Sequence, residues 1–371
     1  MRVAIDARKL HDFGIGTYVR NLLLHLARRD RETDYVVLCQ HKDCQFVKKL
    51  GENFRAVAEW ALPYSIAEQF RVPMHLRRER VDLFHSPHYV LPPLTPCRSI
   101  VTIHDCIHLM FPQYLPNRLA YLYARTFLHI ASRRSNRILT VSESSKKDIV
   151  RLLNVPPEKV TVIYNAIDER FRKEPDEEAV WKVRERYQLH DPFILYTGNI
   201  KPHKNLERLI DAFYRLRRNG LTHVRLLIIG DEISKYPNLR RAVHRYQLHK
   251  HVRFLGYVSN DLLAVLYRLA DVFAFPSLYE GFGLPPLEAM AIGAPVVTSN
   301  VSSLPEVVGD AALLINPLDP DSIADGLRRV LTDSSLREEL RIKGFAQARK
   351  YSWDRSVSHV RKIYGEVVSE I

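Results

Sequence analysis

Short apolar runs alternate with amphipathic helical stretches along this chain. In residues 1–168, six runs of five to seven residues have the apolar, β-branched character of buried strands, at 2–6, 35–39, 82–86, 99–105, 137–142 and 159–165. Apolar positions three and four residues apart predict helices between them, at 16–29, 118–136 and 143–153. This alternation predicts a parallel sheet with helices on both faces.

The second half of the chain repeats the pattern. We predict strands at 193–199, 224–230, 252–256, 271–277, 295–300 and 312–317, and helices at 205–217, 236–248, 259–269 and 285–292. Between the halves, in "AIDERFRKEPDEEAVW", the periodicity lapses and charged residues dominate. We therefore expect two doubly wound α/β domains, 1–168 and 169–352, with a boundary near Asp168. The amphipathic pattern after Trp353 does not itself show which domain the last helix joins.

Length and composition agree with this division. A chain of 371 residues exceeds one ordinary core, and 46% hydrophobic with 26% charged residues is typical of globular proteins. No apolar run reaches the length that spans a bilayer, and "MRVAIDARKL" reads as a strand rather than a signal peptide, so we expect a cytoplasmic protein. The four cysteines lack metal-binding spacing, and we expect free thiols.

The formal charge of +13 is concentrated in the first half. Residues 1–168 contain 25 Lys and Arg against 16 Asp and Glu, whereas the rest contains 30 against 26. Such an excess favours an anionic membrane surface or a phosphorylated substrate. Nucleic acid is disfavoured as a partner, because the basic residues are dispersed and no nucleic-acid-binding motif is present.

The stretch "EGFGLPPLE" separates two carboxylates by a loop and a helix start. Because ligands bind at the carboxyl ends of parallel strands, the loop after 271–277 is a candidate site. Gly281 and Gly283 allow close approach of a ligand to the main chain, Pro285 suits a first helical turn, and the N–H groups there favour an anion. Taken alone, Glu288 could simply complement the helix dipole, worth about 0.3 to 1 kcal/mol, and Gly-x-Gly could be a turn.

Residues 280–299 resemble the signature of retaining glycosyltransferases of family four, which have the GT-B fold. "IDARKLHDFGIGTYVRNLL", "VTIHDCIHLMFP", "LTVSESSKKDIV", "VIYNAID" and "YTGNIKPHKNLERLI" resemble the same family in the right order. The resemblance implies two Rossmann-like domains facing across a cleft, and some features suggest bacterial mannosyltransferases of polysaccharide assembly.

The resemblance assigns a nucleotide-sugar donor to the second domain. It implies that Glu288 binds the ribose hydroxyls and that Glu280 meets hydroxyls of the transferred sugar. The diphosphate between them would rest on the backbone of Gly281, Phe282, Gly283 and Leu284. The resemblance implies no metal, and GDP-mannose is the preferred donor because of the suggested branch.

Lys204 matches the family lysine that binds the diphosphate, although a lysine in an unknown context is most often solvated. The family usually has a basic residue just after Gly198, where this chain has Asn199. Lys201 is a weaker candidate to replace that charge.

In the first domain, His104 resembles the family histidine near the reaction centre. Gly14 and Gly16 follow the first strand but lack the third glycine of a dinucleotide fingerprint, since Val19 stands there. A loop that closes on phosphates or acceptor and a plain helix start are equally open readings of these glycines.

Two patterns mimic metal sites. His104 and His108 are four residues apart, with Asp105, His85 and His88 nearby in the sequence, but 16 histidines produce such spacings by chance. Asp319-Pro-Asp321 resembles a D-x-D metal motif, yet its position before a helix predicts capping instead. We therefore expect no metal.

For the acceptor, the resemblance implies a glycan or a lipid-linked substrate bound by the basic first domain. The predicted helix at 118–137 combines an aromatic stripe with five arginines, which suits peripheral attachment to anionic lipid at the inner face of the cytoplasmic membrane; a core helix with a basic solvent face is the alternative. The resemblance also suggests that the helix 353–371 packs back on the first domain.

The implied reaction is hexose transfer with retention, stabilised by Lys204 and the helix N-terminus. His104, Lys204 and Glu280 are the catalytic candidates. A sugar-nucleotide epimerase, a phosphorylase or a non-catalytic sugar-nucleotide-binding protein are the alternatives.

Overall fold

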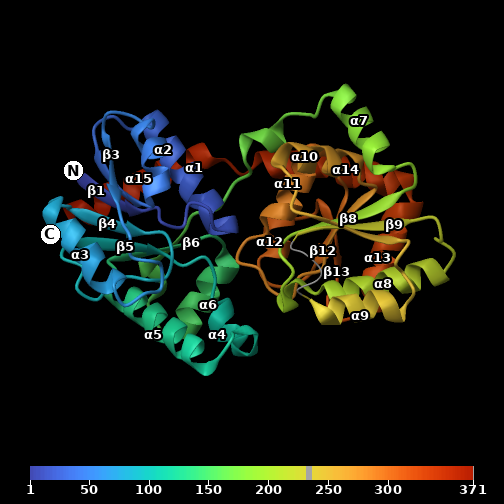
Figure 1. Cartoon of the computed structure of the whole chain (residues 1–371), viewed down its shortest axis with the longest axis horizontal. Coiled ribbons are helices and arrows are strands. Elements are labelled where there is room, and N and C mark those ends of the chain that lie inside the picture. The colour runs from blue at the N-terminus through green and yellow to red at the C-terminus, as the bar shows by residue number, and fades with distance from the viewer. Residues whose placement is uncertain (231–235, 371) are drawn as a thin grey trace. The chain divides into compact units, whose positions relative to one another are not determined.

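The computed structural model describes residues 1–230 and 236–370, and they form two compact units. The first comprises Met1–Ala166 and Ser352–Ile371, and the second Ile167–Tyr351 (Figure 1). The sequence placed the boundary near Asp168, and the division falls between Ala166 and Ile167. Both units are built on parallel sheets, as predicted.

The sheet of the first unit has seven parallel strands in the order β3-β2-β1-β4-β5-β6-β7. These are β1 (Arg2–Asp6), β2 (Asp34–Cys39), β3 (Phe54–Ala58), β4 (Leu83–Ser86), β5 (Arg98–Thr102), β6 (Arg137–Thr140) and β7 (Val160–Val162). The helices are α1 (Phe13–Arg29), α2 (Cys44–Lys48), α3 (Glu68–Arg78), α4 (Ile107–Met110), α5 (Arg118–Arg134), α6 (Glu143–Leu153) and α15 (Trp353–Ser369). Strand β3 was not predicted, because "FRAVA" is a partly exposed edge strand interrupted by arginine.

The predicted amphipathic helices bury their apolar stripes on this sheet. Helix α5 buries Ala124, Leu128 and Ala131 and leaves Arg125 and Arg133 exposed. The core helix with a basic solvent face therefore describes most of α5, although Leu119 and Leu122 at its start are also exposed.

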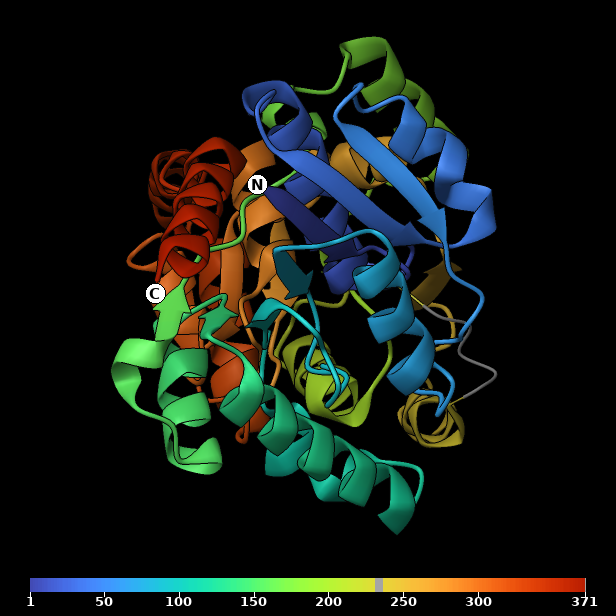
Figure 2. The ribbon, with the colours of Figure 1, turned by 90° about the vertical axis from the view of Figure 1, so that its left-hand side faces the viewer.

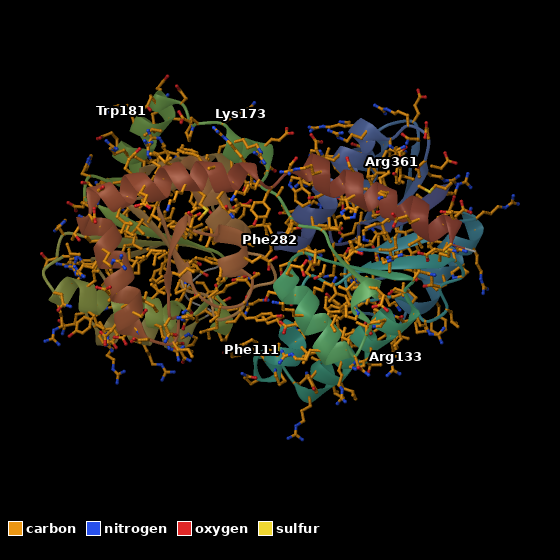
Figure 3. All side chains as sticks on the ribbon, turned by 180° about the vertical axis from the view of Figure 1, so that it is seen from behind. Phe111, Arg133, Lys173, Trp181, Phe282 and Arg361 are labelled. Atoms are coloured by element: carbon orange, nitrogen blue, oxygen red, sulfur yellow. The ribbon has the colours of Figure 1, made fainter. Side chains whose placement is uncertain are left out.

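The last helix, α15, belongs to the first unit. Drawn in red, it lies beside α1 (Figure 1, Figure 2). Asp354 accepts hydrogen bonds from His25 Nδ1 at 2.8 Å and Arg29 Nε at 3.0 Å. Further along, Arg361, labelled in Figure 3, pairs with buried Asp30 at 2.9 Å. Residue 371, the end of the predicted helix, lies outside the described residues.

The second unit repeats the doubly wound arrangement with six parallel strands, ordered β10-β9-β8-β11-β12-β13. These are β8 (Phe193–Thr197), β9 (Arg225–Ile229), β10 (Val252–Gly256), β11 (Val272–Phe275), β12 (Val296–Ser299) and β13 (Ala312–Ile315). The helices are α7 (Glu177–Tyr187), α8 (Leu206–Arg218), α9 (Pro237–Arg245), α10 (Asn260–Leu269), α11 (Leu284–Ile292), α12 (Leu304–Val308), α13 (Pro320–Thr332) and α14 (Ser334–Arg349). Both sheets reverse strand order beside their first strand, where α/β proteins bind ligands.

Three smaller predictions can be checked directly. The Asp319 side chain accepts a hydrogen bond from the Asp321 amide and caps α13, so the capping interpretation is confirmed. All four cysteines are free thiols. Within the described parts of the chain, no helix combines the length and apolarity that crossing a bilayer requires.

The attachment of α15 gives a stability prediction. The Tyr364 hydroxyl lies 2.6 Å from Nδ1 of buried His85, whose Nε2 lies 2.8 Å from the Thr102 hydroxyl. Tyr364→Phe leaves a buried imidazole nitrogen unpaired, so we expect the free energy of unfolding to fall by about 1 to 3 kcal/mol in urea denaturation. Tyr257→Phe, which removes a hydroxyl from a side chain that is 88% exposed, is the control and should change it by less than about 0.5 kcal/mol. Equal effects of the two variants would contradict the structural role of the hydrogen bond.

Candidate functional site

Two loops at the carboxyl edge of the second sheet bring Lys204 and Glu280 into contact. Lys204 follows β8 in a short 3-10 turn, Glu280 follows β11, and these strands are neighbours in the sheet. The Lys204 Nζ lies 2.6 Å from Glu280 Oε1, and the two side chains are 13% and 12% exposed. An ammonium group has three donors, so Lys204 can bind a second acceptor without giving up this one.

Asn205 fixes the Lys204 loop against its neighbours. It adopts a left-handed conformation (φ 63°), and its buried side-chain amide donates to the carbonyls of Pro276 at 2.9 Å and Pro317 at 2.7 Å. The amide of Leu278 also donates to the His203 carbonyl at 2.7 Å. The positions of the ammonium and the following carboxylate are therefore determined jointly.

Two serines that no sequence pattern singles out hold the glutamate loop. Ser302 Oγ accepts from the Glu280 amide at 2.8 Å and lies 2.7 Å from the Glu280 carbonyl. Ser303 Oγ lies within hydrogen-bond distance of the Glu280 and Phe282 carbonyls, at 2.9 and 2.7 Å. These contacts occupy the carbonyls on one side of the loop.

Gly283 begins α11 in a conformation that favours glycine. Its φ is 108°, and a Cβ there would lie 2.7 Å from a methyl group of Leu304. Pro residues occupy the first turn as predicted, and the amides of that turn form the positive end of the helix. The buried Phe282 ring packs against Tyr351, with centroids 5.5 Å apart.

Glu288 lies one turn into α11 and is partly buried. Burial raises its pKa to about 7, opposed by a hydrogen bond at 3.3 Å from the Tyr267 hydroxyl and reinforced by the nearby Asp168 carboxylate. A carboxyl group that titrates near neutrality in a candidate site is typical of functional residues.

The loop after β8 also places Gly198 and Asn199. Gly198 has φ 146°, and a Cβ on Gly230 would lie 2.2 Å from the Gly198 carbonyl oxygen, so the backbones approach closely here. In the part of the chain that the structure describes, the buried Asn199 Oδ1 has no hydrogen-bond partner. Lys201 is exposed.

His104 and the two N-terminal glycines belong to the first unit. The His104 Nε2 lies 2.9 Å from the Pro87 carbonyl, so it carries the proton and leaves Nδ1 as an acceptor. Burial lowers the pKa of His104, which keeps the ring neutral. Gly14 and Gly16 lie in the first turn of α1; a Cβ on Gly16 would meet the Leu10 carbonyl oxygen at 2.6 Å, whereas one on Gly14 would meet nothing within 4 Å.

Two other residues of the apparent metal pattern, His85 and Asp105, have local partners. His85 bonds to Tyr364 and Thr102, and its pKa is lowered to about 3 by burial. Asp105 accepts from the amide of Ile107 and starts a helical turn. These contacts are structural.

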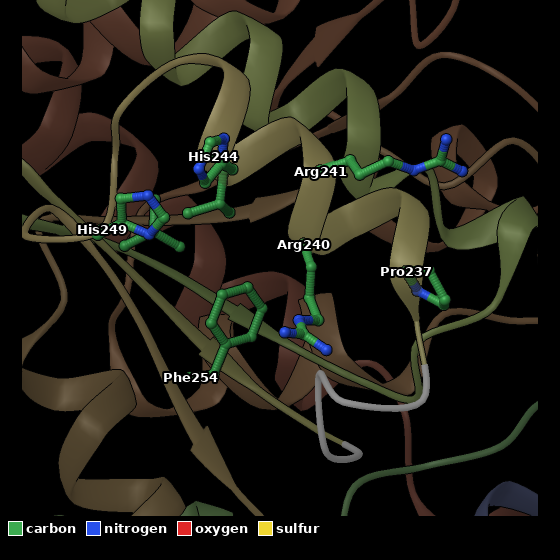
Figure 4. Close-up of a pocket in the computed structure, with 8 residues that line it drawn as sticks. Pro237, Arg240, Arg241, His244, His249 and Phe254 are labelled. Atoms are coloured by element: carbon green, nitrogen blue, oxygen red, sulfur yellow. The ribbon is translucent and has the colours of Figure 1, made fainter.

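A separate hollow of about 570 Å³ lies between α9 and β10 of the second unit (Figure 4). Arg240, Arg241, His244 and His249 line it together with the apolar Val252 and Phe254. The described residues that line it include none of the predicted donor-binding residues. It is a basic surface hollow at the edge of the sheet, apart from the Lys204 and Glu280 pair.

Comparison with known proteins identifies the family. Residues 14–171 match the family described as "Glycosyltransferase Family 4", and residues 179–347 match "Glycosyl transferases group 1". The chain is 35% identical to O-antigen chain mannosyltransferase B of Escherichia coli over 81% of this chain and 78% of that protein. It is 31% identical to O-antigen chain mannosyltransferase RfbU of Salmonella typhimurium over 88% and 90% of the two chains.

A solved structure gives the same fold. The Anabaena protein Alr3699/HepE, in complex with UDP and glucose, superposes with a TM-score of 0.79 at 17% identity, over 99% of this chain and 100% of that one. The chain therefore belongs to the group 1 glycosyl transferases, with a family 4 glycosyltransferase domain in its first half, and has the GT-B fold.

Proposed function

We propose that this protein is a retaining, metal-independent glycosyltransferase that moves mannose from a nucleotide diphosphate sugar to a glycan or lipid-linked acceptor. The observation that carries the proposal is the Lys204 and Glu280 pair beside the N-terminus of α11, with Glu288 one turn further along. This arrangement supplies groups for the ribose, the diphosphate and the hexose of a sugar nucleotide.

The leaving diphosphate is the centre of the proposed site. Transfer of the hexose leaves both electrons of the broken anomeric bond on the diphosphate oxygen, so negative charge develops there. The ammonium of Lys204 and the first-turn amides of α11 stabilise this charge. Because they are held by Asn205, Ser302 and Ser303, little reorganisation is needed as the charge forms. A divalent cation is not required in this scheme.

The two glutamates bind the ends of the donor. The ionised Glu288 accepts hydrogen bonds from both ribose hydroxyls, while Glu280, oriented by Lys204, accepts from hydroxyls of the hexose. In the first unit, the unprotonated Nδ1 of His104 is suited to accept a hydrogen bond from a sugar hydroxyl. The acceptor hydroxyl attacks the anomeric carbon from the side of the leaving group, and its proton passes to a diphosphate oxygen, which accounts for retention.

The choice of mannose rests on the relatives. Both bacterial relatives described above are named mannosyltransferases, which favours GDP-mannose as donor. The Anabaena structure holds UDP, so the base is the least constrained part of the proposal. The basic residues of α5 and exposed Leu119 and Leu122 suit a loosely attached position on anionic lipid, where lipid-linked acceptors reside.

The ribose role of Glu288 predicts a selective loss of nucleotide affinity. In calorimetric titrations with a panel of nucleoside diphosphates, we expect one to bind the wild type clearly and Glu288→Gln about ten- to a hundredfold more weakly, because hydrogen bonds to a charged acceptor are lost. Glu177→Gln, at an exposed position in the first turn of α7, is the control. Unchanged affinity in Glu288→Gln would remove this residue from the ribose site.

The raised pKa of Glu288 predicts a pH dependence of donor binding. With a pKa of about 7, the carboxyl is mostly protonated at pH 6 and mostly ionised at pH 8. Proton and ribose compete for the same oxygens, so donor affinity should rise from pH 6 to 8 and level off above. A sugar nucleotide is the suitable ligand, since its diphosphate diester does not titrate in this range. Glu288→Gln should show a flat profile, and an equal slope in both proteins would assign the titration to another group.

The charge-stabilising role of Lys204 predicts that its removal lowers turnover. The same scheme predicts that a metal chelator leaves turnover unchanged. We expect Lys204→Ala to lower kcat by about 10² to 10³, the usual effect of removing one stabilising group in a transition state. Lys182→Ala, at a lysine of α7 whose side chain is 63% exposed, is the control and should have a small effect. Initial rates with EDTA should match those without it; a rate abolished by EDTA and restored by a divalent cation would overturn the metal-independent scheme.

A further inference from the structure

Tyr64 of the first unit has a backbone conformation that large residues avoid. Its φ is 68°, in the left-handed region. Among the described residues that share this feature without being glycine, four lie one or two residues after an α-helix, where the conformation ends the helix: Arg80, Asn154, Gln188 and Gln247. Tyr64 instead lies in the loop between β3 and α3, as the third residue of a turn closed by a hydrogen bond from the Ser65 amide to the Leu62 carbonyl at 3.2 Å. Such strain persists only where surrounding contacts enforce it, and it is frequent at functional sites.

Buried ionic contacts enforce the conformation of this loop. Glu59 accepts from the Ala61 amide at 2.6 Å and from Arg71 Nε at 2.7 Å. The Ala61 carbonyl accepts at 3.0 Å from Arg8, a buried arginine that also pairs with Glu68 at 2.9 Å. The loop is therefore fastened at both ends to side chains that water does not reach.

The Tyr64 ring is surrounded by other aromatic rings yet remains accessible. Its centroid lies 5.8 Å from that of Tyr89 and 6.1 Å from that of Tyr123, and these three residues are called the tyrosine platform below. The Lys9 ammonium lies 4.5 Å from the Tyr64 centroid. Despite these contacts, Tyr64 is 40% exposed. The uncommon backbone conformation of Tyr64 therefore accompanies a side chain that is partly exposed to solvent.

The platform adjoins the candidate histidine of the same unit. His104 donates to the carbonyl of Pro87, and the ring of the next residue, His88, lies 6.1 Å from that of Tyr64. Polar groups lie close by: the Tyr123 hydroxyl donates to buried Glu68 at 3.3 Å, and Lys9, which lies over the ring, pairs at 2.6 Å with Asp12, whose side chain is 53% exposed. A partly exposed aromatic ring beside a hydroxyl and an accessible carboxylate is complementary to a pyranose, which has an apolar C–H face and a polar edge.

We infer that the tyrosine platform binds a pyranose ring of the acceptor glycan, stacked on Tyr64, and so positions the acceptor relative to His104. This inference rests on the proposed function, since it assigns the acceptor to the transferase reaction. It makes Tyr64 a positioning residue for the acceptor and gives it no part in donor binding.

The test uses the full chain without donor and a panel of trisaccharides of α-linked mannose, glucose, galactose and N-acetylglucosamine, measured by saturation-transfer NMR and calorimetry. We expect the wild type to bind at least one of them. Tyr64→Gly should bind that saccharide at least about tenfold more weakly. Glycine accepts the positive φ without strain, so this variant removes the ring while keeping the loop. Tyr64→Phe should stay within about threefold of the wild type, because the ring is kept.

Trp60→Ala is the matched control. Trp60 is 69% exposed on the same loop and stacks on His41 rather than on the platform, so its loss should leave saccharide affinity unchanged. The affinity of Tyr64→Gly for the sugar nucleotide should equal that of the wild type, which also shows that the variant is folded.

Three results would overturn the inference: no saccharide of the panel binds the wild type, Tyr64→Gly binds as the wild type does, or Tyr64→Gly loses affinity for anionic phospholipid vesicles but not for saccharide. The last would assign the loop, with exposed Leu62 and Ile66, to a membrane. If Glu288→Gln bound the donor as tightly as the wild type, the proposed function would be contradicted instead. The saccharide measurements would still test the platform independently.

Discussion

The ion pair between Lys204 and Glu280 is the contact on which the proposed donor site depends. Two opposite charges, each largely withdrawn from water, must be paired before any ligand arrives, since an unpaired buried charge is costly. The pair keeps the ammonium near the N-terminus of α11, where the main-chain amides carry partial positive charge. In the proposed site, the ammonium and the first-turn amides of α11 thus come from separate elements, and the carboxylate that orients the lysine can also accept hydrogen bonds from hydroxyl groups.

The geometry around this pair is maintained by side chains that take no part in the proposed chemistry. Asn205 joins the lysine loop to the carbonyls of Pro276 and Pro317, and Ser302 and Ser303 hold the glutamate loop from the next crossover. The residues that these side chains bond to in this way lie more than 20 positions away in the sequence for the two serines and more than 70 away for Asn205. A site that must stabilise charge in a transition state benefits from this rigidity, because dipoles already in place do not have to be reoriented during the reaction.

The sequence predicted the features that depend on local pattern. Alternating apolar runs predicted both parallel sheets, and Pro285 predicted the first turn of α11. Features that depend on long-range contacts were not predictable: the edge strand β3 carries too little apolar pattern, and Ser302 and Ser303 are ordinary residues until folding brings them to Glu280. The pKa of Glu288 is of the same kind, since it follows from burial beside Tyr267 and Asp168 rather than from its neighbours in sequence. The placement of Lys204 and Glu280 in one ion pair likewise appears only in three dimensions.

Among the described residues other than glycine, some adopt a left-handed backbone conformation without terminating an α-helix. Tyr64 in the first unit and Asn205 and Ser302 in the second all lie in loops that follow strands, at the carboxyl edges of their sheets. Asn205 and Ser302 each form hydrogen bonds that explain their conformation, and asparagine accepts it readily. Tyr64 is the third residue of a turn that the Ser65 amide closes by donating to the Leu62 carbonyl at 3.2 Å, with Pro63 before it. Glycine or asparagine usually occupies this position, so a tyrosine there is uncommon. The contacts of Glu59 and Arg8 hold the loop in place, and the turn leaves the Tyr64 side chain partly exposed beside Tyr89 and Tyr123.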